Sequence, residues 1–545
     1  MFKHLAHLRL GLRTEVAAVL AAVTAAGFGG QTASAQHSAN DVIRLNRSNP
    51  VIFRNLFPSN RRNDGNNIAG PSMVRIPGFV SSGQRANSNA RYYLYFSDHD
   101  GDYIRMGYSS RPDGGFRLYR AGASTGTRGV FDNNNTSITL DEGIQIRRNH
   151  IASPDVHIDN NQFIMYFHSG APYRFNGRDF DRQVSWVNTS SNGLNFRRRD
   201  TRSVVLGASY FKVFEDRNRL YAVTNDGGPI RARSNNNPFR PPNGYYNGNS
   251  LADLWQSRPA GNEIRSAVSG SRRVRHSGLR RRGSNLELFY TLRGDSPERI
   301  YVSNMSLSSS NWNNWNINIP GNELMRAVGG WEEGQRTPSA SQGGAATNVN
   351  QLRDPDIFED TDGAIYMYYS GAGEEGIGVA AIESSRHNVR TFGATHDAET
   401  RQGGDSNRNF RSSGTITVAN GSGTGRRRGY FRFNTPNGPT VRAAVLRLYL
   451  QNNESGSLDV YGTGNFSEGT ITGNNQPGQQ GSRIDRVPIG FRGFYELDIT
   501  PWVNSNRSRN IRVFVRPTGS SGVQISSSEN GNNSRRPQLK FMQNR

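Results

Sequence analysis

The chain has 545 residues, a formal net charge of +22 at pH 7 and no cysteine. This length allows two or three domains with buried cores, whereas the lack of cysteine excludes disulfides, thiolate zinc sites and cysteine nucleophiles. The charge favours polyanions such as acidic polysaccharide, nucleic acid or an anionic surface, but the arginines are spread along the whole chain and do not define one discrete site.

The first 35 residues have the pattern of a secretory signal peptide. Basic residues (Lys3, Arg9, Arg13) precede the apolar run VAAVLAAVTAAGFGG, and the small residues 33–35 follow it. That order of charge, short apolar run and cleavage site is typical of export, and the run is too short to span a bilayer. We therefore expect a secreted, extracellular protein that begins near Gln36 and has no membrane span.

After the signal, short alternating or aromatic-rich runs are separated by turns of Gly, Asn, Asp or Ser, which is typical of a sandwich, barrel or propeller. One unit recurs, with a polar opening motif that often contains proline, an apolar strand, a turn, an aromatic strand and an edge strand. Repeats of roughly 40 to 70 residues predict propeller blades rather than a solenoid. We expect residues 42–53 to add the strand that closes the ring. The five copies are residues 69–109, 152–170, 209–225, 274–303 and 353–373.

Near residue 390 the pattern changes to evenly spaced alternating strands without the opening motif, such as RGYFRFNT, AAVLRLYLQ and NIRVFVRP. These strands predict a β-sandwich of jelly-roll type. The predicted fold class is therefore all-β, with a five-bladed propeller over residues 36–388 and a smaller carbohydrate-binding-like sandwich over residues 389–545.

Several motifs resemble known families. RDPDIFEDTDGAIYMYYSGAGEEGIGVA (353–380) resembles the last blade of the five-bladed propeller glycoside hydrolases, which are arabinanase, xylosidase and fructosidase-like enzymes. HIASPDVHID, YYLYFSDHDGDYIRMGYS and GDSPERIYVS resemble an uncharacterised bacterial branch of that group, and the match covers roughly residues 45–385. The tail resembles the DNRLRE (disaggregatase-related) carbohydrate-binding module through Asp397-Ala398, GYFRFNT, AVLRLYL, YELDITPWV and SSSENGNNSRRPQLKF.

The resemblance implies a sugar site at the mouth of the propeller channel, with one Asp as base or nucleophile, a second Asp that tunes the acid, and a Glu as proton donor. Such chemistry needs one ionised and one protonated carboxyl, about 5 Å apart for retention or about 6.5–9.5 Å for inversion. This sequence departs from the pattern, because Gly70 stands where the first Asp is expected and the second motif, Ser153-Pro154-Asp155, carries its acid two places later. Only Asp354-Pro355 keeps the familiar form. Either other acids act, or the propeller binds sugar without cleaving it.

The candidate catalytic residues are acids and a histidine near strand ends. Asp354 and Asp155 belong to opening motifs and either face the channel or cap their own turns. Asp98 and His99 belong to the segment Ser97–Asp102, which is a channel-facing acid–base cluster, a structural Ca²⁺ loop or an Asp-Gly hairpin turn. Glu298 is either the proton donor or part of a local ion pair with Arg299.

The candidate substrate-binding residues are histidines, arginines and one tryptophan. His168 ends its strand as His99 does, so both are expected to face a shared axis, with His150 nearby; each can instead be satisfied within its blade. Arg105, Arg275 and Arg353 can hold a carboxylate or sulfate in bidentate fashion or lie on the surface. Trp331 can stack on a sugar, while Glu332, Glu333, Glu374 and Glu375 are weaker acidic candidates.

We therefore expect an extracellular glycoside hydrolase-like protein that binds and cleaves a neutral or acidic polysaccharide. Its C-terminal module is expected to tether the propeller to the polymer. One alternative is a non-catalytic carbohydrate-binding or matrix protein of the same fold. Another is a polysaccharide lyase that uses His or Tyr as base and Arg to neutralise a uronate. No zinc spacing or nucleotide-binding motif appears in the sequence, so we expect no cofactor beyond a structural calcium ion. Nucleic-acid binding rests on charge alone, so we expect no nucleic-acid partner.

Overall fold

The computed structural model describes residues 36–545 except for internal stretches, and the statements below concern the described residues. Within that part Ser38–Arg545 forms one compact unit, and no helix is long and apolar enough to cross a membrane. The predicted signal peptide lies outside the described residues and stays a prediction. The residues left out are 1–35, 46–49, 60–64, 100, 102, 120–128, 133–136, 140–144, 148–149, 171–172, 176–177, 181–182, 197–205, 225–228, 232–255, 258–272, 342–343, 412, 439 and 507–509.

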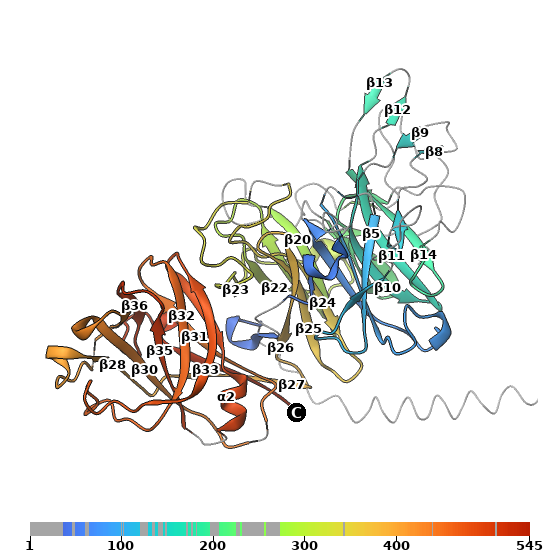
Figure 1. The fold of residues 1–545 in the computed structure, drawn as a ribbon. Helices are drawn as coiled ribbons and strands as arrows, with labels where there is room; N and C mark the ends of the chain where they lie inside the picture. Colours follow the sequence, from blue (N-terminus) through green and yellow to red (C-terminus); the bar gives the residue numbers. More distant parts are fainter. Residues whose placement is uncertain are drawn as a thin grey trace, which may run out of the picture. The chain divides into compact units, whose positions relative to one another are not determined.

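The fold is all-β, as predicted (Figure 1). The described residues contain one α-helix, α2 (Thr500–Ser505), which begins with a proline in its first turn. The remaining helical turns are short 3-10 segments: η1 (Ala39–Asp41), η2 (Arg54–Leu56), η4 (Ser82–Gln84), η5 (Trp312–Asn314), η6 (Gly403–Asp405), η7 (Gly423–Gly425) and η8 (Asn533–Arg535).

The N-terminal part contains propeller-like antiparallel sheets, and each predicted repeat opens one of them. Their strands, from the first outward, are β3 (Ala69–Arg75), β4 (Tyr92–Ser97), β5 (Tyr103–Ser109) and β6 (Arg117–Leu118), with β7 (Phe131–Asp132) beside β5; β10 (Ile151–Asp159), β11 (Gln162–Gly170), β14 (Gln183–Ser190) and β15 (Gly207–Ala208); β16 (Lys212–Asp216), β17 (Arg219–Val223), β18 (Pro229–Arg231) and β19 (Gln256–Ser257); β20 (Val274–Arg282), β21 (Asn285–Leu292), β22 (Ile300–Ser306) and β23 (Asn322–Met325); and β24 (Arg353–Glu359), β25 (Ile365–Gly371) and β26 (Gly376–Ile382).

The last of these sheets is completed by the start of the described chain, as expected. β1 (Val42–Leu45) pairs antiparallel with β26, and β2 (Ile52–Phe53) pairs with the beginning of the same strand. From β1, Arg44 reaches Glu332 (Nε to Oε1, 2.8 Å) and Glu496 of the C-terminal domain (Nη1 to Oε2, 2.9 Å). A further sheet of short strands lies apart from this set: β8 (Ser137–Thr139), β9 (Gln145–Arg147), β12 (Tyr173–Phe175) and β13 (Arg178–Phe180).

The first strands of the sheets are linked to one another in a closed order. The Ser72 hydroxyl accepts a hydrogen bond from Val156 N (2.9 Å), Asp155 accepts one from Val213 N (2.8 Å), and Asp356 accepts one from Met73 N (2.9 Å). These bonds connect β3 to β10, β10 to β16, and β24 to β3. β20 lies against both β16 and β24, which completes the circuit.

A β-bulge occurs at the same place in four of these first strands. The register shifts lie between residues 69 and 72, 152 and 155, 274 and 277, and 353 and 356. Gly70, Ser153 and Asp354 have φ of 61°, 48° and 48°, and Tyr210 has φ of 63° just before β16. A bulge re-aims side chains, and a left-handed φ is costly for a residue other than glycine. One end of the ring therefore carries side chains held in unusual directions.

Residues from 387 onward form a β-sandwich, as predicted, with a hydrophobic core between its two sheets. Tyr495 and Trp502 are structural aromatics here: the Tyr495 hydroxyl donates to Phe491 O, and Trp502 packs on Gly462. One sheet contains β27 (His387–Gly393), β37 (Gln538–Asn544), β31 (Ala443–Leu450), β34 (Gly493–Asp498), β36 (Val523–Ser526) and β29 (Thr415–Asn420). The other contains β28 (His396–Arg401), β30 (Arg426–Asn434), β35 (Asn510–Pro517), β32 (Gly456–Thr463) and β33 (Gln479–Ile489), and β29 also pairs with β30.

Candidate functional site

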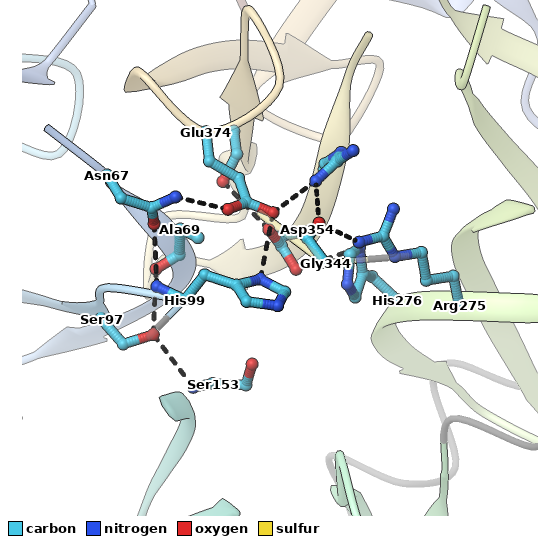
Figure 2. A network of polar contacts seen from close by, with 12 residues as sticks. Asn67, Ala69, Ser97, His99, Ser153, Arg275, His276, Gly344, Asp354 and Glu374 are labelled. Atoms are coloured by element: carbon cyan, nitrogen blue, oxygen red, sulfur yellow. Dashed lines mark hydrogen bonds and ion pairs between the residues drawn. The ribbon is translucent and has the colours of Figure 1, made fainter. Parts of the chain in front are cut away.

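A network of acids, arginines and imidazoles lies where the bulged ends of the first strands meet. Figure 2 shows Asn67, His99 and Glu374 joined by polar contacts, with Asp354, His276 and Arg275 beside them. The segments that carry these residues are the loop before β3, the β4–β5 turn, β20, β24 and the β25–β26 turn. Residues far apart in sequence therefore form one polar cluster.

Glu374 is the anionic centre of the cluster. Its carboxylate accepts hydrogen bonds from Arg353 Nη1 (2.5 Å) and Asn67 Nδ2 (2.6 Å), and it lies 3.3 Å from His99 Nδ1. Burial alone would raise the pKa of Glu374, but the hydrogen bond with His99 and the charge of Arg353 outweigh burial and lower the pKa to about 2. Glu374 is ionised at neutral pH.

Asp354 has the opposite electrostatic character. Burial, and then the charge of Glu374, raise the pKa of Asp354 to about 6, although Arg275 and Arg353 oppose the shift. Its carboxyl accepts a hydrogen bond from the Ser370 hydroxyl (3.2 Å) and lies 3.1 Å from His276 Nδ1. These two carboxyl groups therefore differ, since Glu374 is ionised at neutral pH and Asp354 takes up a proton near pH 6.

Glu298 holds the two arginines of the cluster. It is fully buried and lies 3.0 Å from Arg275 Nη1 and 3.3 Å from Arg353 Nε. Its other oxygen accepts a hydrogen bond from the Thr291 hydroxyl (2.6 Å). Both arginines also donate to the carbonyl of Gly344 (3.0 Å each). Glu298 therefore fixes the positive charges that surround Asp354 and Glu374.

A row of rings connects the two sides of the cluster. His150 Nε2 and His168 Nε2 are 3.0 Å apart, the rings of His168 and Tyr210 are 4.1 Å apart, and those of Tyr210 and His276 are 5.6 Å apart. Burial, and then the neighbouring histidines, hold the pKa of His168 well below its usual range, while burial, and then Arg275 and Arg353, do the same for His276. These two imidazoles are neutral at pH 7.

Most of the residues proposed from the sequence lie in this cluster or its row of rings. The structure brings together Asp354, Glu298, His99, His168, His150, Arg353 and Arg275. Arg105 lies just behind: its guanidinium donates to Asn67 O (2.7 Å) and covers the Phe96 ring (4.9 Å). Since the Asn67 side chain accepts from His99 N (2.8 Å), Arg105 supports the cluster from the protein interior.

Asp155 and Trp331 lie elsewhere. Asp155 follows its bulge by two residues, so its carboxylate meets Val213 N, His157 Nε2 (2.8 Å) and Lys212 Nζ (3.5 Å) between β10 and β16. Although burial would raise the pKa of Asp155, the charges of His157 and Lys212 lower it to about 2. Trp331 stacks on Tyr369 and covers Gly371 and Gly378. Their positions indicate structural roles.

The segment around Asp98 is a turn between β4 and β5, in which Gly101 N donates to Asp98 O (3.3 Å). Asp100 and Asp102, which the calcium alternative requires, lie outside the described residues. Among the residues that are described, no group of three or more His, Asp or Glu side chains is arranged to hold a metal ion.

Sequence reasoning missed Tyr210, His276 and Asn67. Tyr210, just before β16, has the left-handed conformation that Asp354 has in the last repeat, whereas His276 lies in the bulge of β20 at the position equivalent to Pro355. Alignment of the five opening motifs on the Asp354 position would have found Tyr210, but in the fourth repeat it gives Arg275, the neighbour of His276. Asn67 precedes its opening motif and gave no such signal.

Comparison with known proteins finds one matching family model, one relative and several similar solved structures. Residues 388–543 match the model of carbohydrate-binding module family 96; that description does not carry the DNRLRE name, so the narrower resemblance stays a prediction. The uncharacterized protein R118 of Acanthamoeba polyphaga mimivirus is 30% identical over 341 residues, which are 62% of this chain and 88% of that protein.

Three solved structures illustrate the similarity of the propeller part. A GH43_1 enzyme from Xanthomonas citri is 13% identical and covers 58% of this chain and 88% of its own, with a TM-score of 0.34. The α-L-arabinanase of Cellvibrio cellulosa is 14% identical and covers 59% and 92%, with a TM-score of 0.32. CoXyl43, a β-xylosidase/α-arabinofuranosidase from a compost microbial metagenome, is 12% identical and covers 62% and 94%, with a TM-score of 0.36.

Proposed function

We propose that this chain, which belongs to the same family as protein R118 of Acanthamoeba polyphaga mimivirus, is an exported glycoside hydrolase-like protein that cleaves a polysaccharide. The closed order of first strands supports one five-bladed propeller with the polar cluster at the end of its axis. The C-terminal module, which matches a carbohydrate-binding family, tethers the propeller to the polymer and raises its local concentration there.

The observation that carries this proposal is the pair of carboxyl groups whose pKa values are driven apart, to about 6 for Asp354 and about 2 for Glu374. Such separation marks the acid and the ionised partner in glycoside hydrolysis. Protonated Asp354 donates its proton to the glycosidic oxygen as the bond from that oxygen to the anomeric carbon breaks.

His99 is the base in this scheme. Its side chain is 18% exposed, and its Nδ1 lies 3.3 Å from Glu374, so the carboxylate orients the ring and stabilises the imidazolium that forms. His99 takes a proton from the water whose oxygen bonds to the anomeric carbon. The two protons balance, and the solvent returns Asp354 and His99 to their starting states.

A non-catalytic carbohydrate-binding role is the second candidate. It is favoured by the bulge positions themselves, where Gly70, Ser153 and Tyr210 stand instead of acids. A protein of this kind would bind the polymer through the same cluster and release no product.

A polysaccharide lyase is the third candidate, favoured by Tyr210, which lies between His168 and His276 and close to the charge of Arg275. In that reaction a base removes the proton next to the uronate carboxylate, a carbon–carbon double bond forms, and the glycosidic oxygen leaves with a proton. The product carries an unsaturated uronate.

One experiment separates the three. The chain from Gln36 onward is incubated with a panel of neutral and acidic polysaccharides, and reducing ends and ultraviolet absorbance are followed. New reducing ends without absorbance, lost in Asp354→Asn and in His99→Gln, support hydrolysis. Asp362→Asn is the matched control, because Asp362 is an exposed acid in the turn before β25. Absorbance from an unsaturated uronate, or binding without any product, contradicts the proposal.

A further inference from the structure

A pocket lies where the loop after β23 meets the C-terminal domain. It has a volume of about 600 Å³, and it is lined by Gln335, Arg336, Thr337, Ser339, Asn348 and Val349 of the loop and by Asn453, Gly490 and Phe491 of the C-terminal domain. A volume of this size suits a small ligand or a segment of a chain. No residue of the pocket belongs to the polar cluster described above.

Backbone contacts form the floor of the pocket. Phe491 N donates to Gln335 O (2.7 Å), and a Cβ atom on Gly490 would lie 2.2 Å from that same oxygen. Only glycine at position 490 allows this approach. Gln335 is held in turn, since its side chain accepts from Gly330 N (3.1 Å) and donates to Glu333 (2.7 Å). The shape of the pocket is therefore set by the fold.

The walls combine the groups that recognise sugars. Gln335, Thr337, Ser339, Asn348 and Asn453 supply amides and hydroxyls that can donate and accept hydrogen bonds. The ring of Phe491 is half-buried and adds an apolar aromatic face. Arg336 is paired with Glu333 (2.6 Å), so the wall carries little net charge.

Hydrogen bonds link the wall of the pocket to the polar cluster. Ser339, in the pocket wall, accepts hydrogen bonds from Gln351 Nε2 at its carbonyl (3.1 Å) and its hydroxyl (3.2 Å), while the side-chain Oε1 of the same Gln351 accepts from Arg353 Nη2 (2.6 Å). The loop also supplies Gly344, whose carbonyl binds Arg275 and Arg353. One loop thus borders both the cluster and the pocket.

We infer that this pocket is an oligosaccharide subsite, which holds a stretch of the polymer beyond the bond at Asp354. The inference rests on the proposed function for its ligand class, but it concerns binding and not cleavage. Sugar chains long enough to reach the pocket gain contacts that a mono- or disaccharide cannot make.

The test uses the chain from Gln36 onward with the inactivating change Asp354→Asn, so that ligands are not cleaved. Isothermal titration measures binding of disaccharides and hexasaccharides of arabinose, xylose and galacturonic acid. We expect at least one hexasaccharide to bind about tenfold or more tightly than its disaccharide. Phe491→Ala, or Thr337→Trp to fill the pocket, should remove that preference and leave disaccharide binding unchanged.

The matched control is Phe79→Ala, because Phe79 is 37% exposed and lies outside the pocket; it should keep the preference for long chains. A thermal unfolding curve for each variant separates misfolding from lost contacts. The inference is overturned if no hexasaccharide is preferred, or if both pocket variants keep the preference. Failure of the proposed function would appear instead as unchanged polysaccharide cleavage by Asp354→Asn, with the pocket results unaffected.

Discussion

Replacement of Asp354 by Asn should abolish cleavage and stabilise the fold at the same time. The carboxylate is buried beside Glu374, which raises the pKa of Asp354 from 3.8 to about 6. In the unfolded chain this group ionises freely, so above pH 6 the folded state bears the cost of an unfavourable charge. Asparagine keeps the shape and removes that charge.

The size of the effect follows from the shift. A difference of about two pKa units corresponds to about 3 kcal/mol of unfolding free energy at pH 7. The sign follows from linkage, since a carboxyl whose folded pKa is raised costs nothing below pH 4 and destabilises the fold increasingly as pH rises from about 4 to 6. Asp354→Asn should therefore match the wild type at pH 3.5 and exceed it at pH 7.

Two measurements check this prediction. Chemical denaturation at several pH values gives the stability difference, and release of reducing ends gives activity, for which loss of a general acid costs about 10²–10⁴-fold. At pH 7 only about a tenth of Asp354 is protonated if its pKa is about 6, so wild-type activity should fall as pH rises from 5 to 7. A variant that is less stable than the wild type at pH 7, or equally active, would refute the reasoning.

Three further predictions concern charges placed by the fold. Glu374→Gln removes a charge that raises the pKa of Asp354, so the midpoint of the activity–pH profile should move to lower pH. Asp155→Asn weakens the link between β10 and β16. Because the pKa of Asp155 is lowered to about 2, the wild type should have the higher free energy of unfolding above pH 4. This advantage should disappear as pH falls toward 2, which chemical denaturation measures. Burial lowers the pKa of Lys540 from 10.5 to about 7, so Lys540→Met should gain stability relative to the wild type as pH is lowered from 10 to 7 in the same assay.

Much of the fold could be predicted because its signals are local. Alternating apolar residues, turn residues and the recurring opening motif indicate blades, and the motif around Asp354 resembles a known family closely enough to locate a site. The same motif placed Asp155 in the site as well. This part of the prediction was wrong because Asp155 lies two residues after Ser153, which is the residue equivalent to Asp354. Asp155 therefore faces β16, while Asp354 faces Glu374.

Other parts of the site depend on tertiary structure and have no local signal. Tyr210 and His276 enter the cluster only because the start of β16 and the bulge of β20 come together in the fold. The sequence offers Trp331 as a ring that stacks on a sugar, but in the structure the ring packs on the flat surface left by Gly371 and Gly378. Neither arrangement can be read from the spacing of residues in one chain.

The first described strands of the chain complete the last sheet, since β1 and β2 both pair with β26. A ribosome must have synthesised the chain through Ile382 before this seam can form, because the partner strand is absent until then. Until then the pairing of β1 and β2 with β26 is missing, and contacts between segments so far apart in sequence form slowly. Arg44 on β1 also binds Glu496, so the strand that completes the last sheet is also a contact point for the C-terminal domain.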